Sequence, residues 1–233
     1  MELLAVGLWR APNVTAAECH AVLLGEWADA ARAPSSTGAL AINVADIDQG
    51  VYTRRPDADG LVANADAFIV LGLEVAHGLD DLPDRDALHR IARRLDVWRI
   101  VSTPRKVGER AVADHTPSPG IKMVSLMARI AALSHEQFVR HWSENHTPLA
   151  LQHHVGLCNY TQHVVRRAYT PGGRTIDGIA ELYFRTREDF ETKFFDSDAG
   201  RDVIMADVDR FMDLRRSVSS LMTEYLMKIE EPQ

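Results

Sequence analysis

Histidines gather in one stretch of this 233-residue sequence and are its most chemically capable side chains. Six of the ten lie between positions 135 and 163: His135, His141, His146, His153, His154 and His163. An imidazole with an ordinary pKa of about 6.5 can act as acid or base at neutral pH. The cluster predicts proton-transfer chemistry, with solvent-exposed histidines of a helix and a loop as the plain alternative.

A metal site is a second reading of such a cluster, and helical spacing tests it. Two ligands on one α-helix are usually four residues apart, whereas His141 and His146 are five apart and should point away from each other. The two cysteines, Cys19 and Cys158, form no zinc motif or disulfide framework. The adjacent pair of His153 and His154 remains the one metal candidate, and we predict neither a metal nor a cofactor.

The helix expected from about His135 to Glu144 carries an apolar ridge that includes Phe138 and Trp142. A helix should end before Pro148, because proline restricts the residue that precedes it. His146 would then lie in the turn after the helix, where scaffolds often present functional groups. His141, beside the ridge, is the better candidate for a structural role.

Carboxylates stand close to the histidines in the expected hairpin. Period two in the strand at 158–165 places His163 on one face with Asn159 and Thr161, and either face could line a cavity. In DGIAELYF, the residues Asp177, Ile179, Glu181 and Tyr183 share a face opposite a small, apolar set. We expect the apolar set to take helices and the acidic set to face an interior, where Glu181 needs a histidine or arginine partner. A solvent-edge strand is the alternative.

The elements that must position these residues occur twice in the same order. The first half predicts strands at 3–9, 39–44, 67–74 and 97–102, with helices at about 15–31 and 85–95. The second half predicts strands at 122–130, 158–165, 179–184 and 218–227. Helices are expected there at 135–144 and at about 187–214, the latter broken near 197–200. Residues 104–120, rich in proline, glycine and charge, separate repeats at 1–103 and 121–233.

A matching pair of helix starts supports the repeat. Thr15 and Glu18 form one capping box and Ser134 and Gln137 form another, each a few residues after a strand. The βαββαβ order is that of the ferredoxin-like unit, whose sheet carries helices on one face only. We predict an α+β fold of two tandem ferredoxin-like repeats, packed sheet on sheet as an intramolecular, pseudo-dimeric α+β barrel.

Composition narrows the partners and the setting. With 26 Lys and Arg against 33 Asp and Glu, the net charge of −7 disfavours binding to nucleic acid or anionic membranes. The N-terminal apolar run lacks a basic flank and a cleavage site, and no stretch reaches the length of a membrane span. The free cysteines favour a reducing cytoplasm. We expect a small-molecule substrate, no nucleic acid, no membrane, and a homodimer of the pseudo-dimeric chain as a further option.

The second half resembles the EthD family of dimeric α+β barrel proteins over about residues 121–227. The resemblance is carried by HWSENHTPL (141–149), GLCNYTQH (156–163) and DGIAELYF (177–184). The first half matches in topology only and has no histidine that aligns with His146 or His163. The resemblance implies a cofactor-free role in small-molecule catabolism or polyketide processing, with relatives described as lyases, dehydratases, cyclases or lactone isomerases.

Our leading hypothesis is a cofactor-independent lyase or isomerase acting on an aromatic, lactone or polyketide-like acid. His146 would remove a proton and His163 return one, giving elimination, retro-aldol cleavage or double-bond migration. Asp177 or Glu181 would orient a ring nitrogen, and Trp142, Tyr160 and Tyr183 would contact the substrate. The alternatives are a non-catalytic protein that binds a ligand or haem, and a haem-free monooxygenase.

Overall fold

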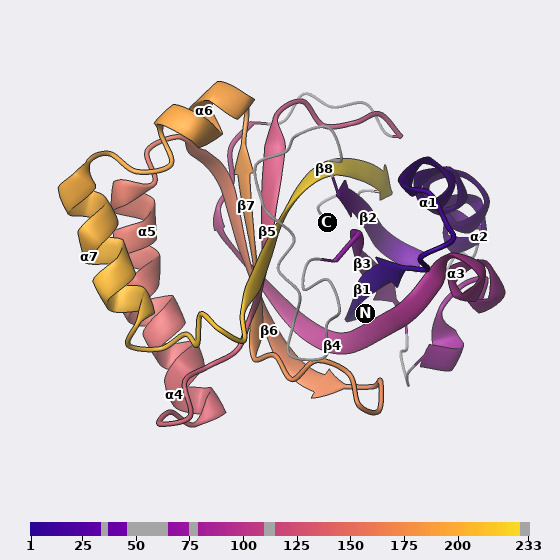
Figure 1. Cartoon of the computed structure of the whole chain (residues 1–233), viewed down its shortest axis with the longest axis horizontal. Helices are drawn as coiled ribbons and strands as arrows, with labels where there is room; N and C mark the ends of the chain where they lie inside the picture. Colours follow the sequence, from indigo (N-terminus) through magenta and orange to yellow (C-terminus); the bar gives the residue numbers. More distant parts are fainter. Residues whose placement is uncertain (34–36, 46–64, 75–78, 110–114, 229–233) are drawn as a thin grey trace.

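In the computed structural model, eight strands form one closed antiparallel barrel (Figure 1). The structure describes residues 1–33, 37–45, 65–74, 79–109 and 115–228. The strands are β1 (Glu2–Arg10), β2 (Thr37–Ala45), β3 (Ala67–Leu73), β4 (Ala92–Lys106), β5 (Ile121–Met127), β6 (Leu157–Ala168), β7 (Gly178–Phe184) and β8 (Val218–Lys228).

Helices lie outside the barrel in two groups (Figure 1). The first group belongs to the first half: α1 (Ala16–Val22), the π-turn η1 (Leu23–Trp27), α2 (Ala28–Arg32), the short 3-10 turn η2 (Leu79–Asp81) and α3 (Arg85–Ile91). The second group belongs to the second half: α4 (His135–Arg140), the π-turn η3 (His141–His146), α5 (Thr147–His153), α6 (Arg187–Thr192) and α7 (Asp198–Val208).

The strand order explains how the barrel closes. Around the barrel it runs β1-β3-β2-β8-β5-β7-β6-β4, so each half has its fourth strand beside its first, then its third and its second. The halves join through the pairs β2–β8 and β4–β6. These pairs satisfy the backbone groups that edge strands would otherwise expose. The inner faces of the two sheets also share one apolar cluster, with Phe68 from the first half and Ile179 from the second, which is the expected sheet-on-sheet contact.

Strand β4 also runs farther than the sequence indicated. It continues to Lys106, which pairs with Tyr160 of β6, so the predicted boundary of the 104–120 segment falls within a strand. The repeat boundaries at 103 and 121 otherwise stay a prediction.

Three apolar clusters form the core, two between the helices and the barrel and one inside the barrel. One lies under α1–α3, and another lies under α4–α7, with Phe138, Trp142 and Phe211 fully buried in it. The third fills the barrel and includes Trp9, Phe68 and Trp98. Alternate strand residues thus face either the helices or the barrel interior.

Both predicted capping boxes are present, and each begins a helix that passes into a π-turn. The hydroxyl groups of Thr15 and Ser134 accept from the backbone of Glu18 and Gln137, whose side chains bond back. Trp27 lies twelve residues after Thr15, as His146 lies twelve after Ser134. Trp27 is fully buried, so a large indole occupies the place in the first half that an imidazole holds in the second.

The helical segment does not end before Pro148, contrary to expectation. The backbone N–H of Thr147 bonds to the carbonyl of Trp142 in a wide π-turn, and the Thr147 hydroxyl donates to the same oxygen at 2.9 Å. Pro148 then stands in the first turn of α5, where a missing N–H costs little. His146 therefore belongs to a continuous helical run rather than to a loop.

Gly178 explains why two of the sequence motifs occur together. A Cβ at this position would stand 2.5 Å from Cζ3 of Trp142 and 3.2 Å from Cε1 of Phe138. Only a residue without a side chain lets these rings lie against β7. The DGIAELYF strand and the HWSENHTPL helix are therefore matched in shape.

We expect Gly178→Ala to lower the free energy of unfolding by about 1–3 kcal/mol, because the added methyl forces Trp142 out of a packed core. Gly25→Ala is the matched control, since nothing lies within 4 Å of a Cβ placed there. Denaturant unfolding measures both. Equal stability of the two variants would contradict the account of this contact.

Candidate functional site

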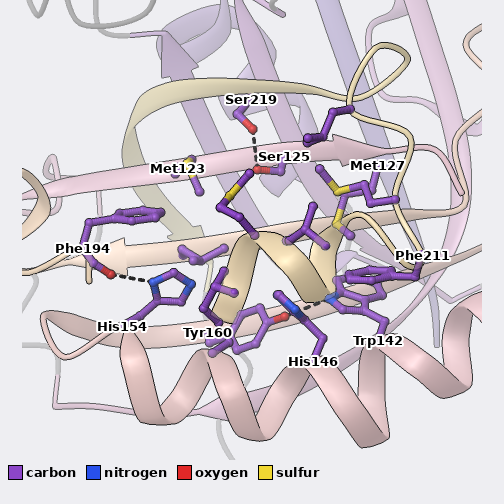
Figure 2. A pocket seen from close by; sticks show the side chains of 18 of the residues that line it. Met123, Ser125, Met127, Trp142, His146, His154, Tyr160, Phe194, Phe211 and Ser219 are labelled. Carbon is purple, nitrogen blue, oxygen red and sulfur yellow. Dashed lines mark hydrogen bonds between the residues drawn. The ribbon is translucent and has the colours of Figure 1, made fainter. Parts of the chain in front are cut away.

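A cavity of about 150 Å³ lies between the helices α4–α7 and the outward face of the second half of the barrel (Figure 2). Figure 2 shows His146 and His154 on the helix side and Ser125 and Ser219 on the strand side. The remaining wall is apolar, formed by aromatic rings, methionines and aliphatic side chains that include Trp142, Tyr160, Phe194, Phe195, Phe211, Met123, Met127, Met205, Met212 and Leu214. Met205 and Leu214 are exposed and mark its outer end.

A buried carboxylate on α7 holds His146 in place. Asp207 Oδ2 lies 2.9 Å from Nδ1 of His146, and Asp207 Oδ1 lies 2.8 Å from Nε2 of His141. The π-turn makes this possible, because its hydrogen bonds span five residues and bring residues five apart onto one side. The expectation that His141 and His146 diverge is wrong for this reason. A carboxylate can only accept, so Nδ1 of His146 carries the hydrogen and Nε2 keeps the lone pair.

The protonation of His146 reflects two opposing effects. Burial lowers the pKa of His146 below 6.5, and this outweighs the nearby Asp207 carboxylate, which raises it. The imidazole is 8% exposed and lines the cavity. A neutral, oriented imidazole at the wall of a largely apolar cavity is suited to accept a proton.

A second imidazole, His154, lies at the C-terminal end of α5 and lines the same cavity. Its Nδ1 is 2.6 Å from the carbonyl oxygen of Phe194, and the rings of Phe194 and Phe195 pack against it. Burial lowers the pKa of His154 to about 4. It is therefore neutral at physiological pH, with its hydrogen on Nδ1.

The other polar groups of the wall bond to one another. Tyr160 OH accepts from Nε1 of Trp142 at 2.9 Å and from Nε2 of Gln162 at 2.9 Å. Burial raises the pKa of Tyr160 to about 12, so the phenol stays protonated. The hydroxyl groups of Ser125 and Ser219 are 2.7 Å apart. These contacts fix the wall rather than present reactive groups.

His163 lies inside the barrel, on the opposite face of β6 from Tyr160. Its Nδ1 is 2.6 Å from the hydroxyl of Ser102 on β4, and its Nε2 is 3.4 Å from Oε1 of Glu181. His146 faces the helix layer. The prediction that His146 and His163 share one cavity is therefore wrong. Tyr160 of β6 lines the cavity of His146, and the period-two alternation of the strand turns His163 to the opposite face.

The acidic face of β7 points into the barrel, as the pattern indicated. Glu181 bonds at 2.7 Å to Nζ of Lys122, which also pairs with Glu224. Burial alone would raise the pKa of Glu181, but the Lys122 ammonium and His163 hold it well below its usual range. The partner expected for Glu181 is thus a lysine, with His163 nearby, and Lys122 forms an internal ion-pair network with Glu181 and Glu224.

The two remaining predicted residues lie outside the cavity. Asp177 accepts from the backbone N–H of Arg129 at 2.9 Å and stands 3.1 Å from Nδ1 of His135. Tyr183 donates its hydroxyl hydrogen to the carbonyl of Pro119. Neither Asp177 nor Glu181 orients His146. Of the predicted set, the structure brings together Trp142, His146 and Tyr160.

Asp207 was missed, although the sequence carries a signal for it, and His154 was considered only as half of a metal-binding pair. Ile204, Val208 and Phe211 form a buried helical stripe on and just beyond α7, and Asp207 falls on the same stripe. An acid on an apolar ridge must be paired if it is buried. His154 follows the last residue of α5 and gives no comparable signal.

The residues present do not fit a haem or a metal cluster. The cavity is about 150 Å³, against about 300–1,000 Å³ for pockets that hold drug-sized ligands, and haem is at the large end of that class. Among the residues that the structure describes, no three His, Cys, Asp or Glu side chains are grouped to hold a metal ion. His153 and His154 face different partners, Asp196 and the Phe194 carbonyl.

The geometry can now be compared with known proteins. Residues 131–215, which include His146, His154 and Asp207, match the family model of the EthD domain. No curated protein matches the chain. The resemblance seen in the sequence is confirmed for this region.

Solved structures support the fold across both halves. An anthrone oxidase-like protein aligns with a TM-score of 0.62 and 10% identity, over 99% of this chain and 94% of its own. A candidate monooxygenase from Lactobacillus acidophilus NCFM aligns at 0.51 and 10%, over 97% and 96%. A mutant chlorite dismutase from Candidatus Nitrospira defluvii aligns at 0.50 and 14%, over 95% and 90%. At these identities the likeness shows the α+β barrel fold of this chain and nothing finer.

None of the helices in the described part of the chain is long and apolar enough to cross a membrane.

We expect Asp207→Asn to lower the pKa of His146 further, because the amide removes the negative charge that favours the imidazolium. Nuclear magnetic resonance of the imidazole carbon-bound protons against pH measures the shift. Asp196→Asn, which touches His153 instead, is the control. An unchanged His146 titration in Asp207→Asn would contradict the ion pair.

His154 should make the protein less stable in acid. Between its ordinary pKa of 6.5 and the folded value of about 4, the unfolded chain binds a proton that the folded chain does not. Above about pH 6.5, His154 is neutral in both states and its burial costs no stability. As the pH drops to 4, the free energy of unfolding falls by about 3 kcal/mol, because only the unfolded chain takes up the proton.

His154→Phe should therefore show a shallower loss of unfolding free energy over this range than the wild type, as measured by urea denaturation. The remaining slope includes His146, whose shift has the same sign. His89→Gln, at an exposed position on α3, should leave the wild-type slope intact. Identical slopes for His154→Phe and the wild type would show that His154 is not buried neutral.

Proposed function

We propose that this protein is an enzyme that moves a proton on a small, largely apolar ring compound held in the cavity beneath α4–α7. One observation carries the proposal: His146 is buried at the wall of an apolar cavity with Nδ1 fixed 2.9 Å from Asp207, which leaves Nε2 as the base. Buried His–carboxylate pairs of this kind fix the tautomer and stabilise the imidazolium once it forms.

The chemistry that fits is of the lyase or isomerase type. Nε2 takes a proton from a carbon beside a carbonyl, and the electron pair enters the conjugated enolate. In double-bond migration the imidazolium returns that proton at the far end of the conjugated system. In elimination the carbon–oxygen bond breaks instead, and the leaving hydroxide takes the proton and departs as water. One imidazole can perform both steps, so His163 is not required.

The cavity volume supports a substrate of one ring. An engineered cavity of about 150 Å³ lined by apolar side chains holds benzene, and the cavity here has about the same volume. Methionines in the wall, including Met205 at the outer end, are flexible enough to adapt to a longer ligand. A single aromatic or lactone ring is therefore favoured over a large polyketide.

A second candidate is oxidation of a ring methylene by O₂, because two of the similar structures are named for oxidase and monooxygenase activity. The first step, removal of a carbon-bound proton by His146, is the same. The methylene then becomes a carbonyl, with one oxygen atom of O₂ inserted and the other released as water. Dependence on oxygen separates this candidate from the first.

A small-molecule substrate and a homodimer of the chain remain predictions. The barrel closes within one chain, so a homodimer is not needed to complete it. Haem binding has no support from the volume of the cavity.

The conversion of cyclohex-3-enone to cyclohex-2-enone tests the proposal, since the substrate is one ring and the reaction moves one proton from carbon to carbon. We expect the wild type to catalyse it with and without O₂. His146→Ala should lower the rate by about 10²–10⁴-fold, the usual contribution of a general base. Absorbance of the conjugated product measures the rate.

His153→Gln is the matched control, because His153 pairs with Asp196 and does not line the cavity. Circular dichroism checks that each variant is folded. A folded His146→Ala variant with the wild-type rate, or a wild type no faster than buffer, would refute the proposal. Oxygen uptake during the reaction would favour the second candidate.

A further inference from the structure

The cavity has two polar atoms that lack a hydrogen-bond partner within the described part of the chain: Nε2 of His146 and Nε2 of His154. The indole, phenol and hydroxyl groups of its wall are already bonded to protein groups. Trp142 and Tyr160 bond to each other, and Ser125 bonds to Ser219. Recognition of a hydrogen-bond donor on the ligand therefore falls to these two imidazole nitrogens.

Both imidazoles present the same kind of atom. Each has its Nδ1 directed at an oxygen that can only accept, a carboxylate for His146 and a backbone carbonyl for His154. The hydrogen of each neutral ring is therefore on Nδ1, and each Nε2 is an acceptor. His146 uses its acceptor as the base, which leaves the acceptor of His154 without a role in the proposed reaction.

His154 is unsuited to be a second base. Its pKa of about 4 means that it holds a proton poorly at neutral pH. As a neutral acceptor in an apolar cavity it can still bond to a donor on the ligand. A ligand without such a donor leaves Nε2 unsatisfied in an apolar site, which costs binding free energy.

We infer that His154 is a specificity-determining residue, and that the substrate is a ring compound with two proton donors: one that reacts at His146 and a hydroxyl or N–H group that bonds to Nε2 of His154. This inference rests on the proposed function for the reacting donor only. The recognition by His154 can be measured without turnover. The substrate class is thus a ring with a second hydroxyl or amine, rather than a hydrocarbon ring with one polar group.

Two matched ligand pairs test the inference by calorimetry: resorcinol against m-cresol and hydroquinone against p-cresol. Each pair exchanges one hydroxyl for a methyl group of similar size. In the wild type the better-fitting diol should bind at least about 10-fold more tightly than its cresol, within the range expected when a buried acceptor is left unpaired. His154→Phe should abolish that ratio and leave cresol affinity within about 2-fold.

The matched control is His153→Gln, because the His153 side chain bonds to Asp196 outside the cavity, so this variant should leave the ratio unchanged. Nitrogen-15 resonances of the wild type give a readout that needs no variant: the diol should shift Nε2 of His154, and the cresol should not. In catalysis, His154→Phe should raise KM for a substrate with the second donor far more than it lowers kcat.

The outcomes separate the two proposals. Cresol and diol that bind equally, or a ratio that survives His154→Phe, would overturn the role of His154 while the cavity and the base stand. Failure of every ring compound to bind the folded wild type would overturn both. Loss of the ratio in His154→Phe together with an inactive wild type would support the recognition and refute the proposed reaction.

Discussion

The buried carboxylate of Asp207 is the contact on which the site depends. One oxygen faces His141 and the other faces His146, so a single acid from α7 orders two imidazoles from the π-turn. A buried carboxylate is costly unless it is paired, and the two rings pair it. In return it determines which nitrogen of His146 is free. The helices α4, α5 and α7 are thereby held at the spacing that leaves a cavity over the sheet.

The two halves share a strand order and differ in what occupies this layer. In the second half the helices stand over a cavity with His146 and His154 at its wall. In the first half the fully buried Trp27 occupies the position that corresponds to His146, within an apolar core. The layer between helices and sheet is thus occupied at this position by Trp27 in the first half, whereas it contains a cavity in the second half. The barrel interior, closed by Trp9, Trp98 and the ion pairs of Lys122, connects the halves and supplies rigidity.

The sequence predicted the elements well because their signals are local. Capping boxes at Thr15 and Ser134 and the order of strands and helices appeared as expected, and the acidic face of β7 was correctly directed inward. Element ends were less accurate: the helix expected at 85–95 ends at Ile91, and the one expected to reach 214 ends at Val208 and is interrupted at 193–197. The site was predicted only in part. His163 was assigned to the cavity of His146, since nothing local shows which face of β6 the helices cover.

The π-turn was the main feature that local rules could not supply. Helical spacing for an α-helix separates residues five apart, and proline rules ended the helix before Pro148. The wide turn reverses both results. A contact from another element supports it, because Gln162 of β6 donates to the Thr147 hydroxyl at 2.8 Å. The partner of His146, Asp207, lies 61 residues away in sequence, so only the packed fold shows the pair.

A crystal structure of the protein soaked with p-cresol would test the central claim most directly. The account predicts ligand density between α4–α7 and the outward face of the sheet, with the ligand hydroxyl at hydrogen-bonding distance from Nε2 of one of the two cavity imidazoles. Ligand density inside the barrel beside His163 and Glu181, with the outer cavity filled by its own side chains, would contradict it.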